Sequence, residues 1–144
     1  MATERRAQVT WRGDLMSGEG AIESVTSGAI GGLPVSWLAR SEEPDGLTSP
    51  EELIAAAHAT CLSMALSHGL AQGGHTPERL ATSATVTFQP GEGITKIALA
   101  VEGHVPGMND DDFRGAAEAA KENCPVSKAL AGVPEITLDA RLAA

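Results

Sequence analysis

The 144-residue sequence is poor in aromatic side chains and contains no tyrosine. Aromatic residues make up 3% of the chain, so its core must be built mainly from alanine, leucine, valine and isoleucine. Because such small side chains each bury little area, an alanine-rich helix needs close packing against a large surface. A second copy of the chain is an obvious candidate for that surface.

Basic side chains are also scarce. The chain has 10 lysines and arginines against 19 aspartates and glutamates, which gives a formal net charge of −9. Binding to nucleic acid requires clustered lysine and arginine that neutralise phosphates, and the sequence has no such cluster. We therefore expect no nucleic-acid partner.

Cysteine is limited to Cys61 and Cys124, too few for a secreted disulfide scaffold. The N-terminal residues Met-Ala-Thr-Glu-Arg-Arg-Ala-Gln-Val lack the apolar core of a signal peptide. An apolar run at residues 53–71 is long enough to span a membrane, but polar residues and glycines interrupt it. We expect a cytoplasmic protein without a membrane partner.

The length predicts a single domain over residues 1–144. Alternating apolar residues and glycine-rich turns predict three N-terminal strands, at residues 7–11, 18–27 and 34–40, in an antiparallel meander.

A long helix is predicted next, at residues 50–72. Ser49 can cap it, Pro50 suits its first position, and Glu52 completes a capping box. Gly73 and Gly74 end it. We expect this helix to be buried on several sides by residues spread around it: Leu53, Ala56, Ala57, Thr60, Cys61, Met64 and Ala71.

The remaining elements follow in a clear order. A hairpin is predicted from residues 81–89 and 94–105. Two helices, at residues 109–123 and 125–130, and a last strand at 135–142 complete the chain. This order predicts an α+β fold with the sheet on one side and the helices on the other.

The surroundings of Cys61 and Cys124 suggest thiol redox chemistry. Cys61 lies in an apolar helix, where burial raises a thiol's pKa, so reactivity needs a cation nearby. Arg40, which ends a predicted strand before the helix, is the candidate; a solvated surface arginine is the alternative. Cys124 precedes Pro125 at a helix start, whose backbone donors favour a thiolate. The alternative for both thiols is simple packing.

Glu51 cannot contact Cys61 within one chain, because ten helical residues span about 15 Å. It could hold an arginine that reaches a cysteine, or merely complement the helix dipole. His58 lies one turn before Cys61, and with Cys124 it would form an incomplete Cys₂His metal set. Such a histidine is more often a satisfied helix residue.

Two motifs closely resemble those of the OsmC/Ohr family of hydroperoxide reductases. The first is Thr-Ser-Pro-Glu-Glu-Leu-Ile-Ala-Ala-Ala-His-Ala-Thr-Cys-Leu-Ser-Met-Ala-Leu at residues 48–66. The second is Lys-Glu-Asn-Cys-Pro-Val-Ser-Lys-Ala-Leu at residues 121–130. The likeness spans nearly the whole chain, and His58 and the position of Arg40 resemble the OsmC branch.

The resemblance implies an intertwined homodimer in which antiparallel sheets wrap long central helices, with sites at the subunit interface. It also implies that Cys61 is the peroxidatic thiolate, Cys124 the resolving thiol, Arg40 the activating group and Glu51 the residue that orients it. Cys61 would form a sulfenic acid and then an intramolecular disulfide with Cys124, which an external thiol, such as a lipoyl-type dithiol, would reduce. No metal, haem or other cofactor is implied.

These observations predict a cysteine-based peroxidase that reduces organic hydroperoxides better than hydrogen peroxide, because an apolar pocket around Cys61 would favour an organic group. Two alternatives stay open. One is a small-ligand or metal-binding protein on the same fold. The other is a structural homodimer whose thiols merely pack.

Overall fold

The structure is a computed structural model that describes residues 1–143. The chain forms two compact units, one over residues 1–53 and the other from Ile54 onward. The long helix α2 (Pro50–Gln72) begins in the first unit and continues into the second.

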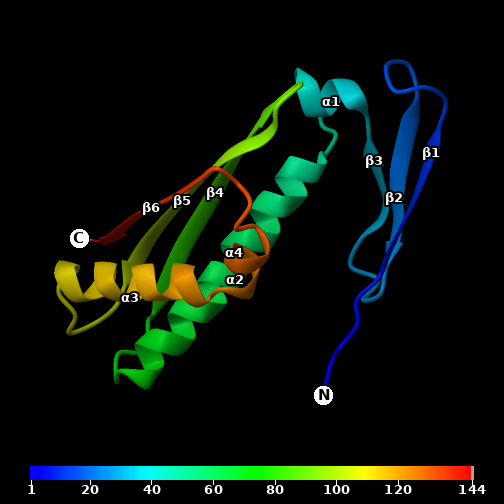
Figure 1. Ribbon diagram of the computed structural model, residues 1–144. Helices are drawn as coiled ribbons and strands as arrows, with labels where there is room; N and C mark the ends of the chain where they lie inside the picture. The colour runs from blue at the N-terminus through cyan, green and yellow to red at the C-terminus, as the bar shows by residue number, and fades with distance from the viewer. Residues whose placement is uncertain (144) are drawn as a thin grey trace. The chain divides into compact units, whose positions relative to one another are not determined.

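The first unit contains a three-stranded antiparallel meander, as predicted (Figure 1). Its strands are β1 (Ala7–Arg12), β2 (Glu19–Val25) and β3 (Gly31–Val35). Gly13 adopts a positive φ of 88° where the chain leaves β1. This conformation suits glycine and opens the turn into β2.

The prediction of a strand over residues 34–40 is wrong beyond residue 35. The chain turns there into a short helix, α1 (Trp37–Ser41), which Ser36 caps by accepting a hydrogen bond from the Ala39 N–H at 3.1 Å. In an extended segment, this backbone N–H would need an acceptor on a neighbouring strand. The serine cap satisfies it locally and so allows the helix to begin. Arg40 therefore lies in the last turn of a helix and does not end a strand.

Helix α2 has the predicted bounds. The Glu52 N–H donates to Ser49 Oγ at 3.1 Å, which is half of the predicted capping box. The Glu52 carboxylate accepts from the Thr48 hydroxyl instead of closing the box. At the other end, Gly74 has a φ of 86°, and the His75 N–H returns to the Leu70 carbonyl at 2.8 Å. These contacts satisfy carbonyls that the helix end would leave unpaired.

The second unit holds a mixed three-stranded sheet in the order β4-β5-β6 (Figure 1). Strands β4 (Arg79–Gln89) and β5 (Gly93–His104) form the predicted antiparallel hairpin. Strand β6 (Glu135–Leu142) has the predicted bounds but pairs parallel to β5. Parallel pairing needs a crossover, which α3 (Asp110–Asn123) and α4 (Pro125–Ala129) supply.

The core of the second unit lies between the helices and one face of this sheet. Alternate β5 residues Ile97, Leu99 and Val101 point into it. Phe113 and Ala117 of α3 pack into the same cluster. So do the α2 leucines at positions 62, 66 and 70. Helices thus cover one side of the sheet, as the predicted α+β arrangement requires.

The prediction that α2 is buried on several sides is wrong for the single chain. Only the face with His58, Leu62, Leu66 and Leu70 is fully buried, at the four-residue spacing of one helix face. Several residues predicted to be buried are exposed instead: Ala56, Ala57, Thr60, Met64 and Ala71. Within the second unit, one long face of α2 with mostly small residues therefore has no covering element.

Among these residues, α2 is the single helix long and apolar enough to cross a membrane, judged by length and composition alone. Core helices of water-soluble domains meet the same criterion. Since its leucines pack into the core of the second unit, we interpret α2 as a core helix.

Candidate active site

The structure brings Cys61 and Cys124 together. Cys61 lies in the middle of α2, and Cys124 ends α3 and begins α4. The two side chains lie close enough for each thiol to shift the pKa of the other, and both are free thiols. Cys124 is fully buried, whereas Cys61 is partly exposed. Within this unit, a reagent from solvent meets Cys61 first.

Cys124 is the more acidic of the two thiols. Its φ of −60° and ψ of 121° are extended, as expected before proline, and place the residue at the N-cap of α4. Burial raises the pKa of the Cys124 thiol, but hydrogen bonds outweigh it and lower the pKa overall. The donors are Cys61, the N–H and hydroxyl of Ser127, and the Val126 N–H.

Cys61 behaves in the opposite way. Burial is the main cause that raises the pKa of the Cys61 thiol, and the hydrogen bond with Cys124 and the charge of Cys124 add to it. A hydrogen bond from the Val126 backbone acts the other way and is too weak to compensate. The second unit by itself therefore makes Cys124 a stronger acid than Cys61. A reactive Cys61 thiolate needs a further cation, as the sequence predicted.

His58 is completely buried beside this pair. Its Nε2 lies 2.7 Å from the Ser127 hydroxyl, which in turn contacts Cys124. Burial lowers the pKa of His58, so the ring is neutral at physiological pH. The metal set of His58, Cys61 and Cys124 finds no support, since no group of three His, Cys, Asp or Glu side chains within residues 1–143 could hold an ion.

Ser127 is a site residue that the sequence analysis missed. It stands three positions after Cys124, in the first turn of α4, and both its hydroxyl and its N–H lower the pKa of the Cys124 thiol. The spacing of a serine and a cysteine around Pro125 was the available signal. Only the fold shows that His58 lies behind the serine.

Arg40 and Glu51 form a second pair, in the first unit. The Arg40 Nε lies 2.9 Å from Glu51 Oε1, and Nη2 lies 3.0 Å from Oε2. The Glu51 side chain is 8% exposed and that of Arg40 is 32% exposed. The guanidinium also lies 5.8 Å from the centre of the Trp37 ring. Bidentate pairing and the ring restrict the arginine to one orientation.

Arg40 also lines an apolar cavity of about 290 Å³ within the first unit. Most of its wall consists of large hydrophobic side chains: Val9, Trp11, Leu15, Ile22, Val35, Trp37, Pro50 and Leu53. A cavity with one charged group in an apolar wall suits a ligand with a polar end and a hydrophobic body.

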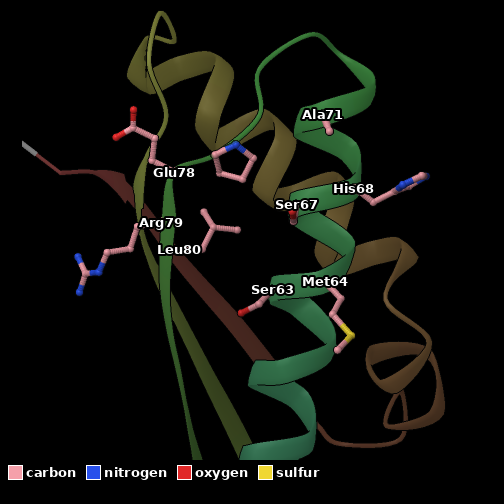
Figure 2. A pocket seen from close by; sticks show the side chains of 9 residues that line it. Ser63, Met64, Ser67, His68, Ala71, Glu78, Arg79 and Leu80 are labelled. Atoms are coloured by element: carbon pink, nitrogen blue, oxygen red, sulfur yellow. The ribbon is translucent and has the colours of Figure 1, made fainter.

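A larger cavity, about 550 Å³, belongs to the second unit. Figure 2 shows it between the second half of α2, where Ser63, Met64 and Ser67 lie, and the start of β4 with Arg79 and Leu80. Neither thiol lines this space. It follows the exposed face of α2 and offers no thiol.

A family model described as OsmC-like protein matches residues 43–139. Peroxiredoxin OsmC of Escherichia coli strain K12 is 43% identical over 145 residues, which cover 99% of each chain. This chain belongs to the OsmC family. The resemblance seen in the two cysteine motifs is thereby confirmed.

Solved structures confirm the family fold. An organic hydroperoxide resistance protein OsmC from Legionella pneumophila superimposes with a TM-score of 0.65 at 21% identity, covering 96% of this chain and 97% of that one. The organic hydroperoxide resistance protein OhrB of Bacillus subtilis gives 0.63 at 23%, covering 96% and 98%. At these identities, the likeness is evidence of fold only.

The full-length match to a peroxiredoxin supports a cysteine-based peroxidase. The roles predicted for Cys61, Cys124, Arg40 and Glu51 stay predictions, although the contacts between the members of each pair are present.

Proposed function

We propose that this protein is a thiol peroxidase that reduces organic hydroperoxides, and hydrogen peroxide more weakly. The observation that carries the proposal is the direct contact of the Cys61 and Cys124 thiols, which come from distant parts of the chain. Two adjacent thiols, of which the outer one is accessible, are what a two-step oxidation to a disulfide requires.

In the proposed reaction, the Cys61 thiolate attacks one oxygen of the peroxide O–O bond. The bond breaks, the alkoxide leaves and takes up a proton as the alcohol, and Cys61 becomes a sulfenic acid. Cys124 then attacks the Cys61 sulfur, an S–S bond forms, and the hydroxyl leaves as water with the proton that Cys124 gives up. An external thiol, such as a lipoyl-type dithiol, reduces the disulfide.

The proposal gives Arg40 the task of stabilising the Cys61 thiolate and Glu51 the task of orienting Arg40. The second unit alone keeps Cys61 protonated, so the first step depends on a permanent cation. Arg40 is suited to this task because its pairing with Glu51 and Trp37 holds the guanidinium in one position. We propose that the two units work as one functional domain.

The substrate preference is argued from the cavity beside Arg40. Its apolar wall would take the hydrocarbon part of an organic hydroperoxide, while the guanidinium would bind the peroxide oxygens. Hydrogen peroxide has no hydrocarbon part and would gain nothing from Trp11, Leu15 or Trp37. Burial of apolar surface contributes about 25 cal/mol per Å², so even a small organic group gains substantial binding energy.

We also propose a homodimer. The exposed face of α2 carries Ala56, Ala57, Thr60 and Met64, and Met64 is 68% exposed. Small residues on one helix face allow the close approach of a second helix. The family relationship supports the same face of a second copy as its cover, and a cytoplasmic location is part of the proposal.

Comparing cumene hydroperoxide with hydrogen peroxide tests the assignment. Wild-type protein with a dithiol reductant should consume the organic peroxide faster, and Cys61→Ser should abolish consumption while the circular dichroism spectrum stays unchanged. Retained turnover in folded Cys61→Ser protein would refute the mechanism. Stoichiometric zinc or copper in the purified protein would favour a metal-binding protein instead.

A further inference from the structure

The proposed mechanism leaves His58 without a task, although it is completely buried and polar. Its Nε2 lies 2.7 Å from Ser127 Oγ, across 69 positions of sequence. Its Nδ1 is buried and has no hydrogen-bond partner among residues 1–143. A buried ring with one satisfied nitrogen and one unsatisfied nitrogen costs stability, so its presence beside the thiols needs an explanation.

The hydrogen-bond directions follow from counting hydrogens. The Ser127 hydroxyl has a single hydrogen, and we infer that it donates this hydrogen to the Cys124 sulfur, because the hydroxyl lowers the pKa of the Cys124 thiol. In its contact with His58, Ser127 must then accept, so the hydrogen lies on His58 Nε2. A neutral ring with hydrogen on Nε2 has a bare lone pair on Nδ1. The orphaned atom is thus an acceptor, which is easier to leave unpaired than a buried N–H.

We propose that His58 and Ser127 are positioning residues that form a one-way donor chain to the resolving thiol: His58 Nε2–H to Ser127 Oγ, and Ser127 Oγ–H to Cys124 Sγ. By donating to the serine oxygen, His58 prevents the hydroxyl from turning away and donating elsewhere. Hydrogen bonds in such a chain also strengthen one another.

The donor chain from His58 through Ser127 matters most after the first oxidation step. In the reduced protein, Cys61 is itself a donor to Cys124. Once Cys61 carries another group on its sulfur, that S–H donor is gone, and Ser127 and the Val126 N–H must stabilise Cys124. The donor chain therefore keeps Cys124 as an oriented thiolate at the moment when it attacks. This inference rests on the proposed function in so far as Cys124 acts as the resolving thiol.

The experiment uses an aromatic disulfide, 5,5′-dithiobis(2-nitrobenzoate), so that it works whether or not the protein reduces peroxides. In the first step, Cys61 attacks the reagent, forms a mixed disulfide and releases one thionitrobenzoate. In the second step, Cys124 attacks the Cys61 sulfur, the protein disulfide forms and a second thionitrobenzoate leaves. Stopped-flow absorbance separates the two releases.

Four single variants and one double variant test the donor chain. Ser127→Ala and His58→Leu remove a hydroxyl and a ring donor, and each should slow the second release about tenfold while the first changes less than threefold. Ser127→Thr and His58→Gln keep a donor at the same place and should recover most of the rate. The double variant His58→Leu/Ser127→Ala should be no slower than Ser127→Ala, because His58 acts only through the serine.

Three results would overturn the inference. One is an unchanged second release in folded Ser127→Ala and His58→Leu proteins. Another is additive slowing in the double variant. The third is a nitrogen-15 NMR spectrum of His58 with hydrogen on Nδ1, which reports the tautomer directly and does not depend on the variants folding. A wild-type protein that shows both releases but consumes no peroxide would refute the proposed function and leave the donor chain standing.

Discussion

Arg40 holds both carboxylate oxygens of Glu51, with its Nε 2.9 Å from Oε1 and its Nη2 3.0 Å from Oε2. The carboxylate is nearly buried, and the loop between α1 and α2 closes the pair over eleven positions of sequence. A buried carboxylate without a cation would destabilise the fold. The need to pair Glu51 therefore keeps Arg40 in place.

Replacing Glu51 by Gln should lower the rate of peroxide reduction about tenfold to a hundredfold, because a hydrogen bond to a charged group is worth ~1.5–3 kcal/mol. The amide keeps the shape of the side chain but loses the charge that orients Arg40. Steady-state peroxide consumption measures the effect.

The matched control is Glu52→Gln. It removes an equal charge from the same helical turn but touches Thr48 rather than Arg40. Equal losses of peroxide-reduction rate in both variants would mean that Glu51 acts by complementing the helix dipole and not by orienting Arg40.

Removal of Cys124 should make Cys61 a stronger acid. Burial, the hydrogen bond to Cys124 and the charge of Cys124 all raise the pKa of the Cys61 thiol. Serine in place of Cys124 carries no charge, so the pKa of Cys61 must fall and its thiolate must appear at lower pH. The rate of alkylation by iodoacetamide as a function of pH measures this shift. A midpoint that moves to higher pH in Cys124→Ser would contradict the charge distribution of the pair.

Ala57→Lys should weaken self-association, because it places a charge on the exposed face of α2 that we propose as the dimer contact. Ala119→Lys is the control, since it makes the same change on an exposed position of α3. Sedimentation equilibrium of the wild type and both variants over a range of concentrations gives the dissociation constants. A monomeric wild type, or equal weakening by both changes, would argue against this face.

Two glycine substitutions in the second unit should change stability in opposite directions. A Cβ at Gly103 would lie 2.5 Å from Cζ of the fully buried Phe113, so Gly103→Ala should cost ~1–3 kcal/mol through overpacking. A Cβ at Gly115, inside α3, meets nothing within 4 Å. Gly115→Ala should therefore stabilise by ~0.5–1 kcal/mol through helix propensity. Urea denaturation measures both, and destabilisation by the second change would contradict the open space seen beside it.

Local sequence signals determined most of the elements. Ser49, Pro50 and Gly73 marked the ends of α2, and alternating apolar residues marked β4, β5 and β6, because caps, turns and side-chain period act over only a few residues. The same local signals failed at residues 36–40, where a serine cap started α1 in a segment that reads as a strand. The two cysteine motifs were sufficient to identify the family.

Only the tertiary structure decided which side chains meet. It brought together three pairs of side chains: Cys61 with Cys124, Arg40 with Glu51, and His58 with Ser127. The members of these pairs are 63, 11 and 69 positions apart in the sequence. It also made β6 parallel to β5 and left one face of α2 uncovered. Such contacts depend on how whole elements pack, so no local pattern carries them. The direction of the proton between the two thiols follows from those contacts: donors from α4 gather at Cys124, and burial keeps Cys61 protonated.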